Sequence, residues 1–348
     1  MRRLFAYLIA LLPGVAAFTG CGLVDEDMGD CETDYTLDYE LSLVTNMTTE
    51  LQTELSLAAD IGISNALRKH LSGIFTDHAH DVDLSFYDTE IDEAAGDAIR
   101  LHHESHIMDG NQSSYTLYIP VRRYMHLAVA NIAGNGDLVL EGDGLCHGAR
   151  LTMPVRDTLD SQRTGLFTAR LAMDVKEGED QTFDVSLYMA NCASSVVVDT
   201  LGTGIRGIRA YATGFATGFN VCDSTYNFAY TPVVRTEQVK MDEPGRICFT
   251  AVTFPSRETP TRSVVDIDDP FVSEAAENAL WRYYLYVDMP DGTVTQSILG
   301  VTHPLRPGQL KIIKVKVTSN GSVQPDDPSI AVSVALDWTP GIDLDVDL

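Results

Sequence analysis

Apolar and polar residues alternate with a period of two along most of this chain, which predicts short β-strands. In residues 35–43, tyrosine and leucine alternate with threonine, aspartate, glutamate and serine, as in a strand with one buried face. The same pattern predicts strands at residues 82–86, 115–121, 125–132, 183–189, 196–198, 281–288, 293–298, 310–317 and 330–338. We expect residues 115–121 to pair with residues 125–132. Turn residues such as Pro290-Asp291-Gly292 separate the segments. The pattern therefore favours an all-β fold.

Helical spacing is clear in one place. Leu67, Leu71, Ile74 and Phe75 recur at intervals of three to four residues, which predicts a helix over residues 64–75. Ser64 is the expected N-cap. Helix is therefore a minor component.

A charged segment with a glycine, residues 176–181, separates two series of predicted strands. A chain of 348 residues has the length of about two domains. We therefore expect two β-sandwich domains, at residues 34–176 and 177–348.

The N-terminus has the pattern of an export signal. Met1-Arg2-Arg3 is basic, and the next 17 residues carry no charge, which is the lower limit for a membrane-spanning helix. Cys21 follows directly, where bacterial lipoproteins are cut and acylated. Asp25-Glu26-Asp27 resembles the export signal of surface lipoproteins in Bacteroidetes-type bacteria. We expect residues 1–20 to be a signal peptide, Cys21 the lipid attachment site and residues 21–33 an acidic tether to the outer membrane.

Composition narrows the range of partners. Asp and Glu number 50 against 24 Lys and Arg, for a formal charge of -26. Nucleic-acid binding needs clustered basic residues, so we expect no nucleic-acid partner.

The cysteines fit an exported protein but leave their pairing open. Of the six, lipidation of Cys21 would leave an odd number, so not all can form disulfides. Cys222 and Cys248 are a candidate disulfide, and buried free thiols are the alternative. Two further sites are suggested by short Asp-Thr-Leu motifs, which make Thr158 and Thr200 candidate O-glycosylation sites.

No pattern of catalytic residues is found. Gly202, Gly204 and Gly207 match G-x-G-x-x-G, but the glycines and aromatic residues that follow oppose the helix a dinucleotide site needs. The histidines at 78, 80, 102, 103 and 106 lack the spacing of a complete metal site, and the sequence contains neither a G-x-S-x-G motif nor a P-loop. We therefore expect no enzymatic activity, no cofactor, no metal and no small-molecule substrate.

Several features in order resemble one family. They are the lipoprotein cysteine, the acidic stretch ending at Cys31, the strand at 35–43, the strand at 82–86, the extended segment at 120–130 and a last strand closing on Asp337-Trp338. This series resembles the FimB/Mfa-type fimbrial anchor lipoproteins of type V fimbriae. The resemblance implies two transthyretin-like β-sandwich domains, an outer-membrane anchor, no enzymatic activity and stalk subunits as partners.

The positions of the basic residues near the N-terminus distinguish an anchor from a stalk subunit. In this assembly class, stalk subunits lose their first strand to an Arg- or Lys-specific protease, and a neighbour's strand fills the vacant groove. This chain has no Lys or Arg between Cys21 and Arg68. We therefore expect the first strand to stay in place and the chain to anchor a fimbria and end or regulate its assembly.

Two other functions would need different sequence features. A surface glycan-binding lipoprotein would need exposed aromatic residues, for which Trp281, Trp338 and the tyrosines at 283–286 are the candidates. Both tryptophans lie in alternating strands, which favours core packing. A secreted hydrolase lacks its catalytic residues.

Overall fold

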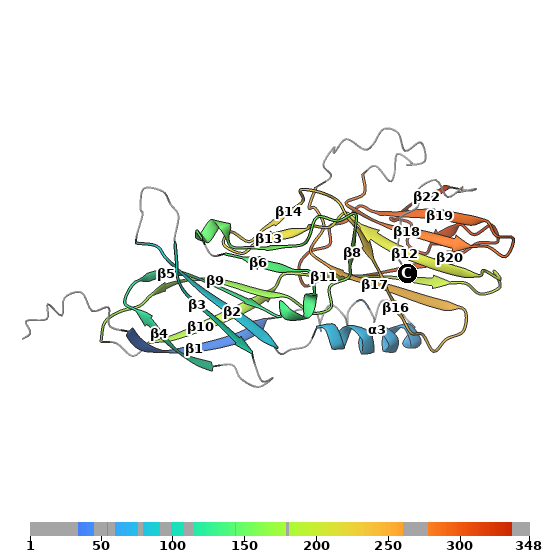
Figure 1. The fold of residues 1–348 in the computed structure, drawn as a ribbon. Coiled ribbons are helices and arrows are strands. Elements are labelled where there is room, and N and C mark those ends of the chain that lie inside the picture. The colour runs from blue at the N-terminus through green and yellow to red at the C-terminus, as the bar shows by residue number, and fades with distance from the viewer. Residues whose placement is uncertain are drawn as a thin grey trace, which may run out of the picture. The chain divides into compact units, whose positions relative to one another are not determined.

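The computed structural model describes residues 34–44, 54, 60–75, 79–90, 99–107, 114–142, 144–178, 181–259 and 278–335. Four β-sheets and one α-helix, α3 (Ile61–Ile74), account for most of them. Two short 3-10 helices, η2 (Ala133–Asn135) and η3 (Cys146–Gly148), lie in connections. Figure 1 shows these elements along the chain.

Sheet A belongs mainly to the first half of the chain, and sheet B combines strands from both halves. Sheet A has the order β3-β2-β5-β9-β10-β1-β4. Its strands are β1 (Asp34–Val44), β2 (Asp81–Asp88), β3 (Ile99–Ile107), β4 (Ser114–Pro120), β5 (Arg123–Ala130), β9 (Phe167–Asp174) and β10 (Thr182–Met189). Sheet B has the order β14-β13-β7-β6 and consists of β6 (Val139–Glu141), β7 (Arg150–Thr152), β13 (Gly218–Asn220) and β14 (Thr225–Asn227).

The other two sheets belong mainly to the second half. Sheet C, in the order β22-β19-β18-β12-β15-β8, consists of β8 (Thr158–Asp160), β12 (Gly207–Thr213), β15 (Val233–Arg235), β18 (Trp281–Asp288), β19 (Val294–Val301) and β22 (Ala331–Ala335). Sheet D, in the order β16-β17-β11-β20-β21, consists of β11 (Cys192–Asp199), β16 (Glu237–Val239), β17 (Arg246–Thr253), β20 (Leu310–Val317) and β21 (Val323–Pro325).

Sheets C and D pack face to face to form a β-sandwich. Tyr283, Leu285 and Val287 point inward from β18, and Ile313 and Val315 meet them from β20. Alternate residues of these strands are buried because the side chains of a strand point to opposite faces in turn. The periodicity that predicted strands at 281–288 and 310–317 therefore marks the inner faces of this sandwich.

Sheets A and B enclose a second core. Tyr87, Leu127 and Val129 of sheet A meet Leu151 of β7 and Phe219 of β13. The opposite face of sheet A contributes Leu84, Phe86, Ala128 and Phe167 to a third core, which also contains the buried residues of α3.

The domain boundary predicted at residue 176 does not separate sheets. The chain turns there from β9 to β10, and these two strands pair within sheet A. β8 from the first half joins sheet C, and β13 and β14 from the second half complete sheet B. The charged segment is thus a hairpin connection on sheet A, and the two sandwiches are not consecutive segments of the chain. Whether they fold independently stays a prediction.

The pairing expected between residues 115–121 and 125–132 is wrong. β5 pairs with β2 on one side and with β9 on the other, so the backbone groups on both of its edges are hydrogen-bonded to these strands. β4 instead lies beside β1 at the end of sheet A.

Candidate functional site

The first strand, β1, is the element on which the functional expectation depends, and it lies inside sheet A. It runs parallel to β10, from the pair Asp38–Thr182 to the pair Val44–Tyr188. Its other neighbour is β4. Because β1 has a strand on each side, its backbone donors and acceptors are used within the chain. This arrangement agrees with the expectation that the first strand stays in place.

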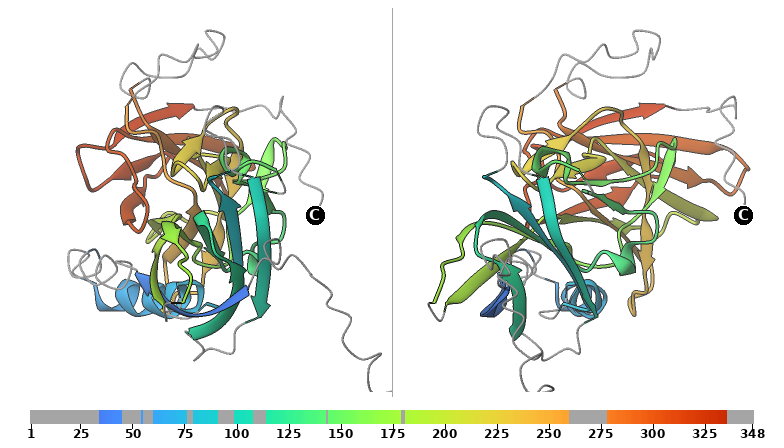
Figure 2. Two further views of the ribbon diagram at one scale, coloured as in Figure 1. Left: turned by 90° about the vertical axis from the view of Figure 1, so that its left-hand side faces the viewer. Right: turned by 60° about the vertical axis from the view of Figure 1, so that its left-hand side comes forward.

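Helix α3 follows β1 in sequence and covers the outer face of sheet D. Its buried residues Ile63, Leu67 and Leu71 share a core with Val239 of β16 and Cys248 of β17. Figure 1 and Figure 2 show the helix alongside β16. β11 is buried along almost its whole length because α3 lies over one face of sheet D and sheet C over the other.

The other end of α3 contacts sheet A. The Gly165 amide donates to the Ile74 carbonyl at 2.9 Å, and Phe75 and Phe167 belong to the same core. A Cβ on Gly165 would lie 3.1 Å from the Phe75 ring, so glycine permits this close approach. Helix α3 therefore joins the part of the chain that carries β1 to the sandwich of sheets C and D.

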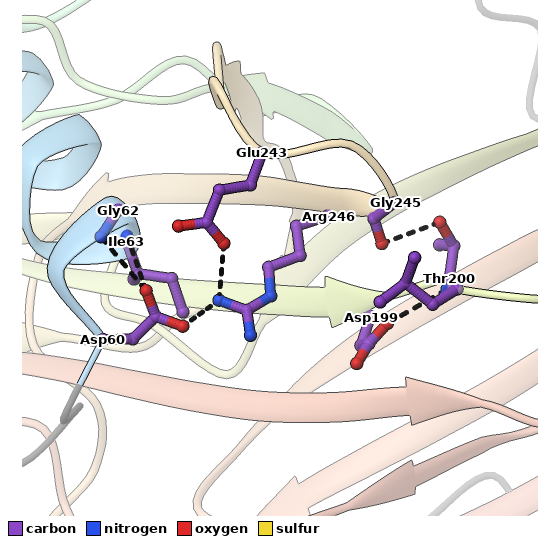
Figure 3. A network of polar contacts seen from close by, with 9 residues as sticks. Asp60, Gly62, Ile63, Asp199, Thr200, Glu243, Gly245 and Arg246 are labelled. Atoms are coloured by element: carbon purple, nitrogen blue, oxygen red, sulfur yellow. Dashed lines mark hydrogen bonds and ion pairs between the residues drawn. The ribbon is translucent and has the colours of Figure 1, made fainter.

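A polar network holds the start of α3. The Asp60 carboxylate accepts hydrogen bonds from the amides of Gly62 and Ile63, at 3.1 and 3.3 Å. Its other oxygen pairs with the guanidinium of Arg246, the first residue of β17 (Figure 3). Asp60 is therefore the N-cap, and the expected cap Ser64 lies inside the first turn. A carboxylate fits here because the helix N-terminus carries a partial positive charge and unpaired N–H groups.

The same network continues across the ends of sheet D. The Arg246 guanidinium also donates to Glu243 at 2.8 Å. The neighbouring Gly245 carbonyl accepts from the amide and the hydroxyl of Thr200, at 2.7 and 2.9 Å (Figure 3). At the middle of the helix, His70 Nε2 lies 3.0 Å from the Thr250 hydroxyl. These contacts fix α3 at several points along sheet D.

The expected disulfide between Cys222 and Cys248 is wrong. Cys222 is bonded to Cys146, with Cα atoms 5.9 Å apart. Cys248 faces α3 from sheet D, whereas Cys222 follows β13 in sheet B, so the two cysteines belong to different cores. Cys248 and Cys192 are buried free thiols, and burial raises the pKa of each thiol to about 12. Both thiols therefore stay protonated and chemically inert at neutral pH.

The other candidate sites lie apart from one another. Thr158 is half-buried in β8 at the end of sheet C, and the Thr200 hydroxyl is bonded to Gly245. O-glycosylation at either residue stays a prediction. Cys21, the signal peptide, the acidic tether and Trp338 lie outside the described residues.

The glycine motif and the described histidines have structural contacts and form no cofactor or metal site in the described residues. Gly202 and Gly204 have φ values of 75° and 65° in the connection after β11, and Gly207 begins strand β12, so the glycines form a turn without a helix. His103 Nε2 lies 2.6 Å from Asp83. In the described part of the chain, no group of three or more His, Cys, Asp or Glu residues could hold a metal ion.

Two of the aromatic candidates for glycan binding, Trp281 and Tyr283, are buried, whereas Tyr284 and Tyr286 are half-buried. Trp281 is 1% exposed, and its indole Nε1 donates to the His303 carbonyl at 3.0 Å. Tyr283 is fully buried and bonded to Ser194 at 2.8 Å. Within the described residues, no helix combines the length and the apolar character that crossing a bilayer would need.

Comparison with known proteins identifies the fold. No protein-family model and no curated protein matches the sequence. A candidate adhesin from Bacteroides ovatus is similar in structure with 10% identity and a TM-score of 0.51, over 90% of this chain and 98% of that chain. A second one, from Bacteroides ovatus ATCC 8483, has 12% identity and a TM-score of 0.50, over 88% and 99%. The fimbrial anchor protein Mfa2 from Porphyromonas gingivalis has 10% identity and a TM-score of 0.47, over 88% and 100%.

These likenesses span almost the whole length of each solved structure. The expected fold class, an all-β chain of sandwiches with minor helix, is therefore confirmed. At this level of identity, the likeness to the two Bacteroides proteins concerns the fold alone.

Proposed function

We propose that this chain is a FimB/Mfa-type outer-membrane lipoprotein that anchors a fimbria to the cell surface and ends or regulates its assembly. The observation that carries the proposal is the position of β1 between β10 and β4. A subunit that extends a fimbria must have a vacant strand position for its neighbour's strand. Here the chain's own first strand occupies that position.

Resistance to processing supports the same function. The first Lys or Arg after Cys21 is Arg68, which lies in the middle of α3. Cleavage there would release β1 together with the half of the helix that contains the buried residues Ile63 and Leu67. Local unfolding of the helix would have to precede cleavage, and the Asp60–Arg246 ion pair and the helix core oppose it.

Membrane attachment is the second part of the proposal. Removal of residues 1–20 and acylation of Cys21 would place the chain on the outer membrane, and residues 21–33 would act as a tether of a few nanometres. A stalk subunit would bind by adding a strand to a sheet edge, where unpaired backbone groups supply affinity. This function needs no cofactor, nucleic acid or enzymatic activity.

The test is genetic. Deletion of the gene is expected to release fimbriae into the medium or to change their length. Cys21→Ala should reproduce that effect while the circular dichroism of the domains stays unchanged. Cys31→Ala is the matched control and should leave fimbriae attached. Normal attachment and length in both the deletion and the Cys21→Ala strain, with no pilin crosslinked to the protein, would refute the proposal.

A further inference from the structure

The outer face of sheet B carries a cavity that the proposed function does not use. Its volume is about 550 Å³, and it is lined by residues of β7, β13 and β14 and by Phe228 and Arg257. Sites for small ligands have typical volumes of about 300–1,000 Å³. The cavity is therefore large enough for one or two sugar rings.

Strand register explains the hollow. Thr152, Gly218 and Asn227 lie opposite one another on the three strands, and Gly218 occupies the central position. The next row on the same face is Arg150, Asn220 and Thr225. Because Gly218 has no side chain, the cavity reaches its backbone between the polar side chains of the two rows. The residues between the two rows point the other way, as Leu151 and Phe219 do into the core.

Charge distinguishes this cavity from the rest of the chain. Asp and Glu number 50 in the sequence against 24 Lys and Arg, yet the cavity lining contains Arg150, Arg257 and His147 and no acidic residue. Arg150 pairs with Glu141 on the neighbouring strand. An anionic ligand is therefore favoured at this cavity over the rest of the surface.

Arg257 is the basic residue best placed for a ligand. Its guanidinium lies 4.5 Å from the centre of the Phe228 ring, and its Nη2 donates to the Phe228 carbonyl at 3.1 Å. In the described part of the chain it has no carboxylate partner, and neighbouring Glu258 accepts instead from Nε and Nη2 of Arg306, at 2.9 and 3.0 Å. A guanidinium oriented by stacking keeps its remaining N–H groups for a planar carboxylate.

The walls of the cavity are fixed covalently. The disulfide joins Cys146, beside His147, to Cys222, two residues after the end of β13. The Asn220 amide spans the same two segments by donating to the His147 carbonyl at 3.2 Å. A preformed cavity loses little conformational entropy on binding.

We propose that this cavity binds a carboxylate-bearing sugar, such as a sialic or uronic acid at the end of a glycan. Arg257 would hold the carboxylate, and the amide and hydroxyl groups of Asn227 and Thr152 would bind the ring hydroxyls. The ring would rest over Gly218, beside the aromatic edge of Phe228. This inference does not depend on the anchor function, because a terminal subunit and a subunit inside a fimbria could both present the cavity.

The experiment is calorimetric titration of the mature full-length chain with sialyllactose, a glucuronate disaccharide, lactose and phosphate. Saturable binding of at least one acidic sugar is expected, at least tenfold tighter than binding of lactose. Arg257→Gln should weaken that binding at least tenfold. Asn227→Ala, at an exposed position, should weaken it less. Arg209→Gln is the matched control because Arg209 also lies over an aromatic ring, 5.8 Å from the centre of Tyr286, outside the cavity.

Several results of these titrations would overturn the proposed sugar site. Equal affinity for lactose and the acidic sugars, binding of phosphate alone, or no binding of either acidic sugar would overturn it. An Arg257→Gln protein that binds as tightly as the wild type would also overturn it. Circular dichroism of each variant separates a lost contact from a lost fold. Fimbrial attachment is a separate measurement, so failure here would leave the anchor proposal standing.

Discussion

Breaking the Cys146–Cys222 disulfide should remove a large part of the stability of this protein. The bond closes a loop with a sequence separation of 76 residues. In the chain-entropy model, the restriction of the unfolded chain by a loop of that length is worth about 4.5 kcal/mol at 25 °C. Stability margins of single domains are about 5–15 kcal/mol, so the loss would be easily measured.

The assay is urea unfolding followed by circular dichroism, with and without a thiol reductant. Reduction should lower the free energy of unfolding by about 4 kcal/mol in the wild type. It should do the same in Cys248→Ala, whose own stability is lower because a buried side chain is shortened. Cys222→Ala should be insensitive to reduction. If Cys248→Ala abolishes the reductant effect, or if peptide mapping joins Cys222 to Cys248, the structural assignment is wrong.

Three further predictions concern the internal contacts. Leu67→Ala should lower the free energy of unfolding by about 2–5 kcal/mol because Leu67 is fully buried between α3 and sheet D, whereas exposed Arg68→Ala should change it little. Asp60→Ala should cost about 1–2 kcal/mol through the lost helix cap, and wild-type stability in this variant would contradict the cap assignment. Burial lowers the pKa of His126 from 6.5 to about 4. Between pH 6.5 and pH 4 the unfolded chain therefore binds more protons than the folded chain. The free energy of unfolding should fall by up to about 3 kcal/mol as the pH drops through this range. His126→Gln should lose that component of the pH dependence in denaturant titrations at pH 7 and pH 4.

Local sequence patterns predicted the strands that have one buried face. The alternation at 281–288 coincides with β18 because only its inner residues contact the opposite sheet. β11 was predicted only in its apolar core, residues 196–198, because both of its faces are covered and its residues do not alternate. Strands of three residues, such as β7, β13 and β14, are too short for any periodicity. The cavity formed by these short strands could therefore not be predicted.

The helix cap Asp60 could have been predicted from the sequence. The apolar series of α3 extends back to Ile63, four residues before Leu67, and this places the start of the helix next to Asp60 rather than at Ser64. Its ion-pair partner Arg246 lies 186 residues away in sequence. The pairing of Cys222 with Cys146 is likewise set by the sheet that brings them together, and spacing alone leaves several pairings open.

The N-terminus of the mature protein shows whether β1 remains part of the chain at the cell surface. The protein should be extracted from the outer membrane of cells that assemble fimbriae and contain the Arg- or Lys-specific protease. Intact-mass analysis is expected to show a single chain that begins at an acylated Cys21 and includes residues 34–44. A mature chain that begins after Arg68 and lacks β1 would refute the anchor function.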